Sequence, residues 1–434
     1  MSGDRIPSLL VIDLKALRTA PDDFRAPLAR RGVSSATIDR LLEIDEQRRA
    51  LMTQAQDLRA EQKQFGRRIG QATPEERPAL IEESGTFSAR IEALETDEAA
   101  LEVEQNTILL TIPNVPHPEA PDGVDDEDAV EVQQFGDKPD FDFEPADHVA
   151  LGEALGILDI ERAVKVSGSR FAFLLGDAVF LEFALVRYAM DIIAGHGFTP
   201  VIPPVLTREE ALFGTAFLPG SADQIYKVPE DDLYLVGTAE VPLAGMHMDE
   251  IFEADQLPLR YGGFSTCFRR EAGTYGKDTS GIFRVHQFDK VEMFSWVTPE
   301  ESWEEHERLR AIQTEVLSGL GLHGRVVDIA VGDLGDSAAR KYDQEVWLPG
   351  QGRYRELTSA SNCTDYQARR LKARYRTDDG TRTVHTLNGT ACAVGRTIIA
   401  VLETHQQADG SIVLPDALVQ MMGKERLVPV SPQG

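Results

Sequence analysis

Apolar residues recur at every seventh position in two runs between residues 36 and 110, and a break at residues 70–78 separates the runs. Rows at this spacing, each with a weaker row between its members, predict two long helices packed as an antiparallel coiled coil. At about 1.5 Å per residue each helix would extend about 45 to 50 Å, so we expect a projecting arm. The strong rows are Ile44, Leu51, Leu58 and Phe65, then Leu80, Phe87, Leu94, Leu101 and Ile108.

The pattern changes from residue 113 onward. Residues 113–140 are rich in proline and acidic side chains, which is typical of a linker with little structure of its own. Beyond them, a helical pattern at residues 180–194 mixes with strand-like apolar runs. We therefore expect two domains, residues 1–112 and residues 113–434, the second an α+β domain with an antiparallel sheet. The predicted strands cover residues 233–236, 261–268, 282–294 and 326–330.

Residues 268–292 predict two antiparallel strands joined by a glycine-rich loop at residues 273–281. Arg269 and Glu271 are two residues apart, so they should share one face of the first strand. The return strand should also alternate. One of its faces would carry Arg284, His286, Phe288 and Lys290, and the other Val285, Gln287, Asp289 and Val291.

Length and composition indicate a globular protein of more than one domain. The chain has 434 residues, of which 42% are apolar and 27% are charged. It has no apolar run of roughly 20 residues and no signal-peptide pattern, so we expect a cytoplasmic protein that does not bind membranes. Its three distant cysteines, Cys267, Cys363 and Cys392, argue against a disulfide framework and a zinc site. Cys363 is predicted to be a small buried apolar residue. The alternative is that it acts as a thiol nucleophile with His385.

The net charge of −28 would repel nucleic acid on average, so a polyanionic partner needs a local basic patch. The first arm helix supplies a candidate, because its basic residues concentrate toward the tip while the second helix is strongly acidic. The alternative is an ordinary solvated helix face. The basic residues are Arg48, Arg49, Arg59, Lys63, Arg67 and Arg68.

Two arginines of the predicted hairpin suit a nucleoside triphosphate. A guanidinium is a forked, permanently charged donor to phosphate oxygens, so Arg269 and Arg284 can hold a bent triphosphate from both ends. Phe288 can stack on an adenine, and Glu271 completes the group. The alternative is a set of surface ion pairs on an edge hairpin.

Glu356 and Ser359 form a second candidate group, since their oxygens can share a hard cation. Magnesium that bridges phosphates typically takes only one or two protein carboxylates, so this pair would suffice. The alternative for this pair is a simple turn.

A third group contains Thr238, Glu240 and Glu292. Two carboxylates near a nucleotide are unfavourable unless a cation lies between them, and an α-ammonium or a substrate hydroxyl would fit. The alternative is a pair of solvent-facing charges.

In the fourth group, Asn388 and Thr390 precede a predicted helix that carries Arg396. Donors at a helix N-terminus with an arginine one or two turns later suit an anionic or polar substrate. The alternative is a buried apolar helix over residues 391–402 with one snorkelling arginine. The sequence has neither a P-loop nor GxGxxG after a strand, which disfavours the parallel-sheet nucleotide folds.

Together these groups resemble the bacterial-type seryl-tRNA synthetases, a family of class II aminoacyl-tRNA synthetases. The resemblance covers nearly the whole chain, from VIDLKALRTAPDDFRAPLARRG through the arm to three class II motifs in order. Motif 1 corresponds to residues 180–196 followed by GFTPVIPPVL, motif 2 to FRREAG through RVHQFDKVE, and motif 3 to the segment that ends at Arg396. The fold so implied is a class II antiparallel-sheet catalytic domain after a coiled-coil arm.

The resemblance also implies a role for each site residue. Arg269, Glu271 and Arg396 would be catalytic, and Glu356 and Ser359 would hold Mg²⁺. ATP would be bound by Arg269, Glu271, Arg284, Val285, Phe288, Glu356, Leu357, Ser359 and Arg396. Serine would be bound by Thr238, Glu240, Arg269, Glu292, Asn388 and Thr390.

The implied activity is serine–tRNA ligation. L-serine would be activated with ATP and transferred to the 3′ end of tRNA(Ser), and also of tRNA(Sec). Residues 274–280 would approach the acceptor end. Pro203 and Pro204 match a dimer-interface strand, so a homodimer is implied. No zinc is expected, as the cysteines already indicate. The arm, in residues 1–112, would contact tRNA through Arg48, Arg59, Lys63, Arg67 and Arg68.

Alternatives to this activity remain. Relatives that charge carrier proteins with amino acids lack the arm that this chain has. A regulatory paralogue would have lost motif arginines or Glu356, and none is missing here. A paralogue that serves antibiotic resistance or a biosynthetic pathway would keep every site residue, so the sequence leaves that alternative open.

Overall fold

The structure is a computed structural model that describes residues 12–273 and 281–430. The predicted motif 2 loop at residues 274–280 lies outside the described residues. The chain divides into two compact units that meet between Val115 and Pro116. Across the described ranges, no helix is both long enough and apolar enough to cross a membrane.

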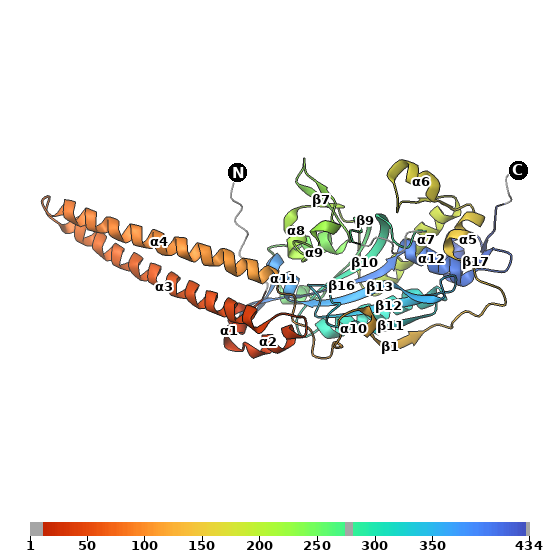
Figure 1. The fold of residues 1–434 in the computed structure, drawn as a ribbon, viewed down its shortest axis with the longest axis horizontal. Coiled ribbons are helices and arrows are strands. Elements are labelled where there is room, and N and C mark those ends of the chain that lie inside the picture. Colours follow the sequence, from red (N-terminus) through yellow and green to blue (C-terminus); the bar gives the residue numbers. More distant parts are fainter. Residues whose placement is uncertain (1–11, 274–280, 431–434) are drawn as a thin grey trace. The chain divides into compact units, whose positions relative to one another are not determined.

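The N-terminal unit is built on two long antiparallel helices (Figure 1). The coiled-coil prediction is confirmed, because Ile44 and Leu58 are buried between these helices and the rings of Phe65 and Phe87 lie 5.6 Å apart. The first long helix begins after Ser34, whose hydroxyl accepts a hydrogen bond from the Thr37 amide. The helices of this unit are α1 (Leu14–Thr19), α2 (Asp22–Ala29), α3 (Ser35–Gln71) and α4 (Arg77–Leu110).

The opposite charges of α3 and α4 pair along the arm. Arg48 of α3 forms ion pairs with Glu98 and with Glu102 of α4, the latter at 2.9 Å. Arg59 of α3 likewise pairs with Glu95 of α4. Such cross-helix pairs flank the apolar seam and help to fix the register of the coiled coil. The Arg48 guanidinium is thereby committed to contacts within the arm.

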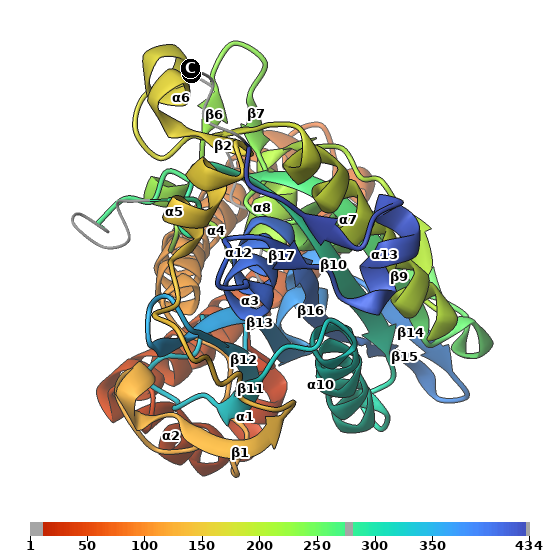
Figure 2. The ribbon, with the colours of Figure 1, turned by 90° about the vertical axis from the view of Figure 1, so that its right-hand side faces the viewer.

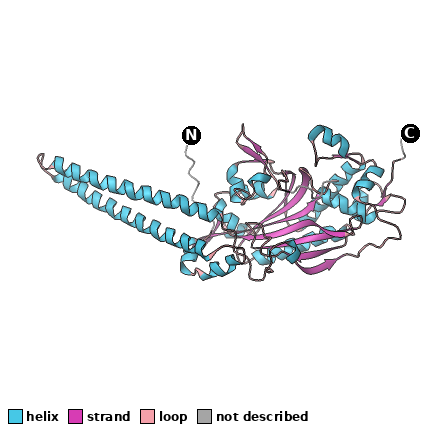
Figure 3. Cartoon of the chain, viewed as in Figure 1, coloured by secondary structure: helices cyan, strands magenta, loops and turns pink. Residues whose placement is uncertain are grey.

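An eight-stranded sheet lies at the centre of the C-terminal unit (Figure 3). Its order is β1-β11-β12-β13-β16-β10-β9-β4, and every neighbouring pair is antiparallel except β4 and β9 at one edge. The predicted α+β fold is therefore confirmed. The strands are β1 (Val130–Phe135), β4 (Thr199–Val201), β9 (Leu259–Phe268), β10 (Gln287–Val297), β11 (Gly324–Asp328), β12 (Arg340–Leu348), β13 (Arg353–Thr364) and β16 (His385–Ala393).

Both faces of β10 are covered. Figure 2 shows α7, α10 and α12 beside the sheet. Val291 and Met293 belong to the main core, which the helices α7 (Asp177–Gly195), α10 (Ser302–Gly319) and α12 (Val394–His405) complete. Phe294 and Trp296 point the other way, into a second cluster with α9 (Glu240–Gly245) and α11 (Tyr366–Leu371). Because side chains alternate along a strand, Glu292 lies on the same face as this second cluster.

Three sequence predictions about element boundaries are wrong. The strand predicted at residues 282–294 begins only at Gln287, whose ladder partner Phe268 ends β9. Arg269 and Glu271 therefore follow β9 instead of sharing its face, and Glu271 has a left-handed backbone with φ of 50°. The helix predicted from residue 391 begins at Val394, because β16 continues through Ala393. Where these ladders stop depends on the partner strand, which alternation along one strand does not reveal.

The predicted linker at residues 113–140 also contains a strand. β1 pairs with β11 at the edge of the sheet, and five of its six residues are exposed. Its apolar alternation is limited to Val130 and Val132, and an irregularity between Glu131 and Gln133 interrupts it, which is too short a pattern to identify a strand.

Shorter elements surround the sheet. They are η1 (Asp126–Asp128), α5 (His148–Ala154), β2 (Leu158–Asp159), α6 (Ile160–Ser167), β3 (Phe173–Leu174), β5 (Leu206–Thr207), α8 (Glu209–Gly214), η2 (Ala222–Gln224), β6 (Lys227–Val228), β7 (Leu233–Leu235), β8 (Ile251–Phe252), η3 (Ala254–Gln256), β14 (Arg374–Thr377), β15 (Gly380–Thr383), β17 (Ile412–Val413), α13 (Asp416–Met422) and β18 (Arg426–Leu427).

Candidate active site

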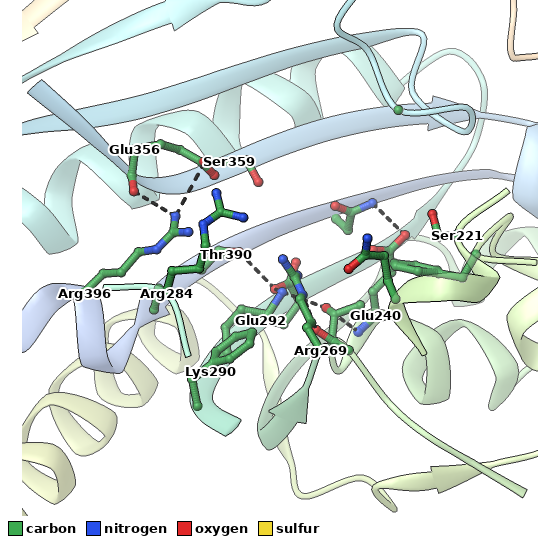
Figure 4. A pocket seen from close by; sticks show the side chains of 18 of the residues that line it. Ser221, Glu240, Arg269, Arg284, Lys290, Glu292, Glu356, Ser359, Thr390 and Arg396 are labelled. Atoms are coloured by element: carbon green, nitrogen blue, oxygen red, sulfur yellow. Dashed lines mark hydrogen bonds and ion pairs between the residues drawn. The ribbon is translucent and has the colours of Figure 1, made fainter. Parts of the chain in front are cut away.

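A cavity of about 550 Å³ lies over β10, β13 and β16 of the C-terminal unit. Every residue that the sequence analysis assigns to ATP or serine lines this cavity. Figure 4 shows Glu356, Arg396 and Arg284 at one end and Glu240 at the other, with Arg269 and Glu292 between them. The site residues are Thr238, Glu240, Arg269, Glu271, Arg284, Val285, Phe288, Glu292, Glu356, Leu357, Ser359, Asn388, Thr390 and Arg396.

Glu240 is buried at one end of the cavity. Its Oε1 accepts hydrogen bonds from Gln367 at 2.7 Å and from Asn388 at 3.1 Å. Burial raises the pKa of the Glu240 carboxyl to about 7, and the nearby Glu292 carboxylate adds to the rise. A buried acid with a pKa near neutrality can change charge when a cationic ligand arrives.

Glu292 and Lys290 form a buried ion pair on β10. Lys290 also donates to the Thr238 hydroxyl at 2.7 Å, and Thr390 of β16 donates to Glu292 Oε2 at 3.1 Å. These contacts give a buried carboxylate the charge partner and donors that it needs. The result is a small polar chamber rather than two solvent-facing charges.

Arg269 lies between the two ends of the cavity. Its Nε donates to the Gly237 carbonyl at 3.1 Å, and its guanidinium lies 5.3 Å from the centroid of the Phe288 ring. The backbone contact fixes the base of the guanidinium at the middle of the cavity. The ring of Phe288 is only half buried, so one part of it still faces the cavity.

The carboxylate of Glu271 accepts a hydrogen bond from Arg284 Nη1 at 2.7 Å. Both residues lie in the connection between β9 and β10, outside the regular ladder. This contact joins the segment that follows β9 to the segment that precedes β10. The prediction that Arg269 and Glu271 share one face of a strand is wrong, as described above.

Arg396, Glu356 and Phe283 form the other end. Arg396 donates to the Glu356 backbone oxygen at 2.9 Å, approaches its carboxylate at 3.5 Å, and lies 4.6 Å from the Phe283 ring centroid. Burial alone would raise the pKa of Glu356, but Arg396 and Lys341 outweigh it, so this pKa lies below its usual value. The Glu356 carboxylate therefore stays charged, and 46% of its side chain is accessible at the cavity wall.

Several residues of the site escaped the sequence analysis. The sequence predicted a strand face for Lys290 but no role. Its spacing from Phe288 and Glu292 places it on the same strand face as Glu292, a residue predicted to bind serine. Gln367 and Lys341 carried no signal, because only the folding of α11 and β12 brings them to Glu240 and Glu356. Asn388 and Thr390 lie within β16 and not at a helix N-terminus as predicted.

The basic residues of the arm differ in their surroundings. Arg48 and Arg59 pair with acidic residues of α4, as described above. Lys63, Arg67 and Arg68 are exposed toward the end of α3, and Arg68 lies 5.0 Å from the Phe65 ring centroid. The exposed charge therefore concentrates in the last turns of α3.

Two family models match the chain. Residues 11–116 match the seryl-tRNA synthetase N-terminal domain. Residues 226–405 match the core domain of class II tRNA synthetases for G, H, P, S and T. The second match includes β10, β13, β16 and α12, and every site residue named above lies within it.

Whole-length relatives give the same result. The serine–tRNA ligase of Thermobifida fusca is 53% identical over 97% of this chain and 100% of its own length. The crystal structure of seryl-tRNA synthetase from Pyrococcus horikoshii complexed with ATP has a TM-score of 0.91, at 43% identity over 97% of this chain and 100% of that one. A cytoplasmic serine–tRNA ligase from Naegleria fowleri in complex with AMP has a TM-score of 0.86, at 33% identity over 95% and 96%. This chain belongs to the seryl-tRNA synthetase family of class II aminoacyl-tRNA synthetases.

Proposed function

We propose that the protein is a serine–tRNA ligase, which activates L-serine with ATP and transfers the seryl group to the 3′ end of tRNA(Ser), and also of tRNA(Sec). The observation that carries this proposal is the division of one cavity into two ends. A buried chamber with Glu240 and Glu292 adjoins a region with Arg269, Arg284 and Arg396. Such a cavity suits a small amino acid placed against a nucleoside triphosphate.

The chamber would hold serine by its charged and polar groups. Glu240 would attract the α-ammonium, and Glu292 with Thr390 would bind the hydroxyl, supported by Thr238 and Asn388. Alanine lacks the hydroxyl and could not make the additional hydrogen bond to these buried groups that serine would make, which can give large discrimination. The closed walls of the chamber would exclude the extra methyl group of threonine.

The other end would hold ATP. Phe288 would stack on the adenine, and Arg396 would reach the γ-phosphate. The nucleotide would be framed by Glu271 with Arg284, by Val285 just before β10 and by Leu357 of β13. The serine carboxylate would attack the α-phosphorus in line, with Arg269 against both reacting groups, and pyrophosphate would leave. A ribose hydroxyl of the terminal adenosine would then take the seryl group and release AMP.

Glu356 and Ser359 fit a magnesium ion. Both line the cavity beside Arg396, and the depressed pKa keeps Glu356 in the charged form that a hard cation requires. Bound there, Mg²⁺ would neutralise phosphate charge.

We propose that residues 1–112 form the tRNA-binding domain and residues 113–434 the catalytic domain. The exposed Lys63, Arg67 and Arg68 at the end of α3 would contact the phosphate backbone of tRNA, with Arg59 beside them. Arg48 would contribute less than Arg59 to this contact, because 18% of the Arg48 side chain is accessible beside Glu98 and Glu102, against 55% of the Arg59 side chain beside Glu95.

A homodimer in the cytoplasm completes the proposal. Phe180 and Phe183 of α7 are 63% and 64% exposed, and Ile202 after β4 is 83% exposed. Exposed apolar residues gathered in motif 1, near Pro203 and Pro204, indicate a surface for a second copy of the chain.

The test is ATP–pyrophosphate exchange and aminoacylation with a panel of amino acids and total tRNA. Exchange that depends on serine, followed by transfer to tRNA(Ser), is the expected result. Serine-dependent exchange without transfer to tRNA would favour a ligase that charges carrier proteins. Exchange with an amino acid other than serine would refute the assignment of the chamber.

A further inference from the structure

We propose that His148 is a positioning residue for the ATP end of the cavity and that it acts through the backbone of Ile282. His148 is the first residue of α5 and does not line the cavity. The inference rests on the proposed function only for its kinetic readout, because the contact itself is between protein groups.

His148 is anchored on its far side by Glu403, a fully buried residue of α12. Glu403 Oε1 lies 3.1 Å from both the backbone nitrogen and Nδ1 of His148. Glu403 Oε2 accepts a hydrogen bond from the Gly350 amide at 3.0 Å. A buried carboxylate with several donors is held firmly in place, so it can fix the imidazole that it contacts.

The tautomer of His148 follows from its other neighbour. The Ile282 amide approaches Nε2 at 3.4 Å, and a backbone N–H can only donate. Nε2 must therefore be unprotonated, which places the imidazole proton on Nδ1, where it points at Glu403. The imidazole thus passes the orientation set by α12 to the backbone of Ile282.

The chain at Gly281 passes directly over the imidazole. A Cβ at Gly281 would lie 2.0 Å from His148 Nε2, and the backbone there has φ of 76°. No other residue fits this approach without displacing either the ring or the chain. The contact therefore fixes the point at which the chain returns from the motif 2 connection.

The two residues after Ile282 reach the ATP end. Phe283 lies under the guanidiniums of Arg396 and Arg355, at 4.6 and 3.6 Å from its ring centroid, and Arg284 pairs with Glu271. Arg396 and Glu403 are seven residues apart, two turns of α12, and so lie on nearly one side of it. The helix α12 therefore fixes the position of Arg396 directly. Through His148 it also fixes the position of the segment from Ile282 to Arg284.

Two substitutions separate this role from simple packing. His148→Gln can place an amide oxygen near the Nε2 position and keep an acceptor for Ile282. His148→Asn can place an amide nitrogen near the Nδ1 position, facing Glu403, but has no atom that reaches Ile282. Gly281→Ala attacks the same contact from the other partner.

We expect His148→Asn and Gly281→Ala to raise the KM for ATP about five- to tenfold, the effect of one hydrogen bond, with the KM for serine little changed. His148→Gln should stay within about twofold of the parent. Hydrogen exchange of the Ile282 amide should rise in the first two variants only. Thermal unfolding and calorimetric ATP binding without serine are measured in parallel.

Equal behaviour of the Asn and Gln variants would overturn the inference, as would equal rises of the two KM values or an unchanged exchange rate at Ile282. A parent enzyme that shows no serine-dependent exchange would refute the proposed function instead. The positioning role would then still be judged by ATP binding and by exchange at Ile282.

Discussion

At the scale of single residues, the site is a set of charges that compensate one another. Lys290 neutralises Glu292 and donates to Thr238, while Gln367 and Asn388 hold Glu240. Removal of one member leaves its partner buried without compensation, and such losses cost more than the bond itself. The residues of this chamber should therefore be sensitive even to nearly isosteric changes.

Glu292→Ala tests the hydroxyl site. The variant should lose about 10- to 100-fold in kcat/KM for serine-dependent ATP–pyrophosphate exchange, the range for a lost bond to a charged group. Glu292→Gln, which keeps a partner for Thr390, should lose less. Near-normal exchange by the Ala variant, at an unchanged thermal midpoint, would contradict the serine site.

The pH dependence of serine binding should follow Glu240. Its pKa is raised to about 7, so the carboxyl gains a proton as the pH falls through 7 and loses its attraction for the α-ammonium. The KM for serine should rise as the pH falls, approaching about tenfold per unit well below the pKa. Glu240→Gln should show a high KM with little dependence on pH. A parent KM that is constant from pH 8 to pH 6 would refute this role.

At the scale of elements, each helix and strand of the site serves more than one purpose. β10 places Val291 and Met293 in the main core and Lys290 and Glu292 in the chamber, because alternate side chains face opposite ways. The arm helix α3 likewise buries one stripe against α4 and leaves basic residues exposed on the rest. A charge reversal on its exposed side should therefore leave the fold intact.

The double variant Arg67→Glu, Arg68→Glu tests the arm. The KM for tRNA in aminoacylation should rise about tenfold or more at low salt, with a smaller salt dependence, because two phosphate contacts are lost. Serine-dependent exchange without tRNA should not change. Arg90→Glu, an exposed substitution on the acidic helix α4, is the matched control. Equal effects of the two variants on tRNA charging would contradict a specific contact at the end of α3.

At the scale of the whole molecule, the exposed phenylalanines of α7 remain to be covered. Phe183→Glu should place a charge in the proposed dimer surface and shift the protein toward monomer in sedimentation experiments at micromolar concentration. Val103→Glu, an equally exposed apolar site on α4, is the control. A parent protein that sediments as a monomer would refute the homodimer.

The sequence by itself determined the features that depend on local spacing. Heptad rows are sufficient to predict the antiparallel arm, because a seven-residue repeat places one stripe of each helix against its neighbour. The motif residues were likewise identifiable, since Arg269, Glu356 and Arg396 stand in segments whose order along the chain is specific.

Only the tertiary structure decided where strands end and which charges meet. Gln287 begins β10 because its partner Phe268 ends β9, so Arg269 and Glu271 lie beyond the ladder. Lys290 is tied to Thr238, 52 residues away, and Gln367 to Glu240, 127 residues away. A buried charge is balanced by whichever groups the fold brings to it, and their distance along the chain leaves no periodic trace in the sequence.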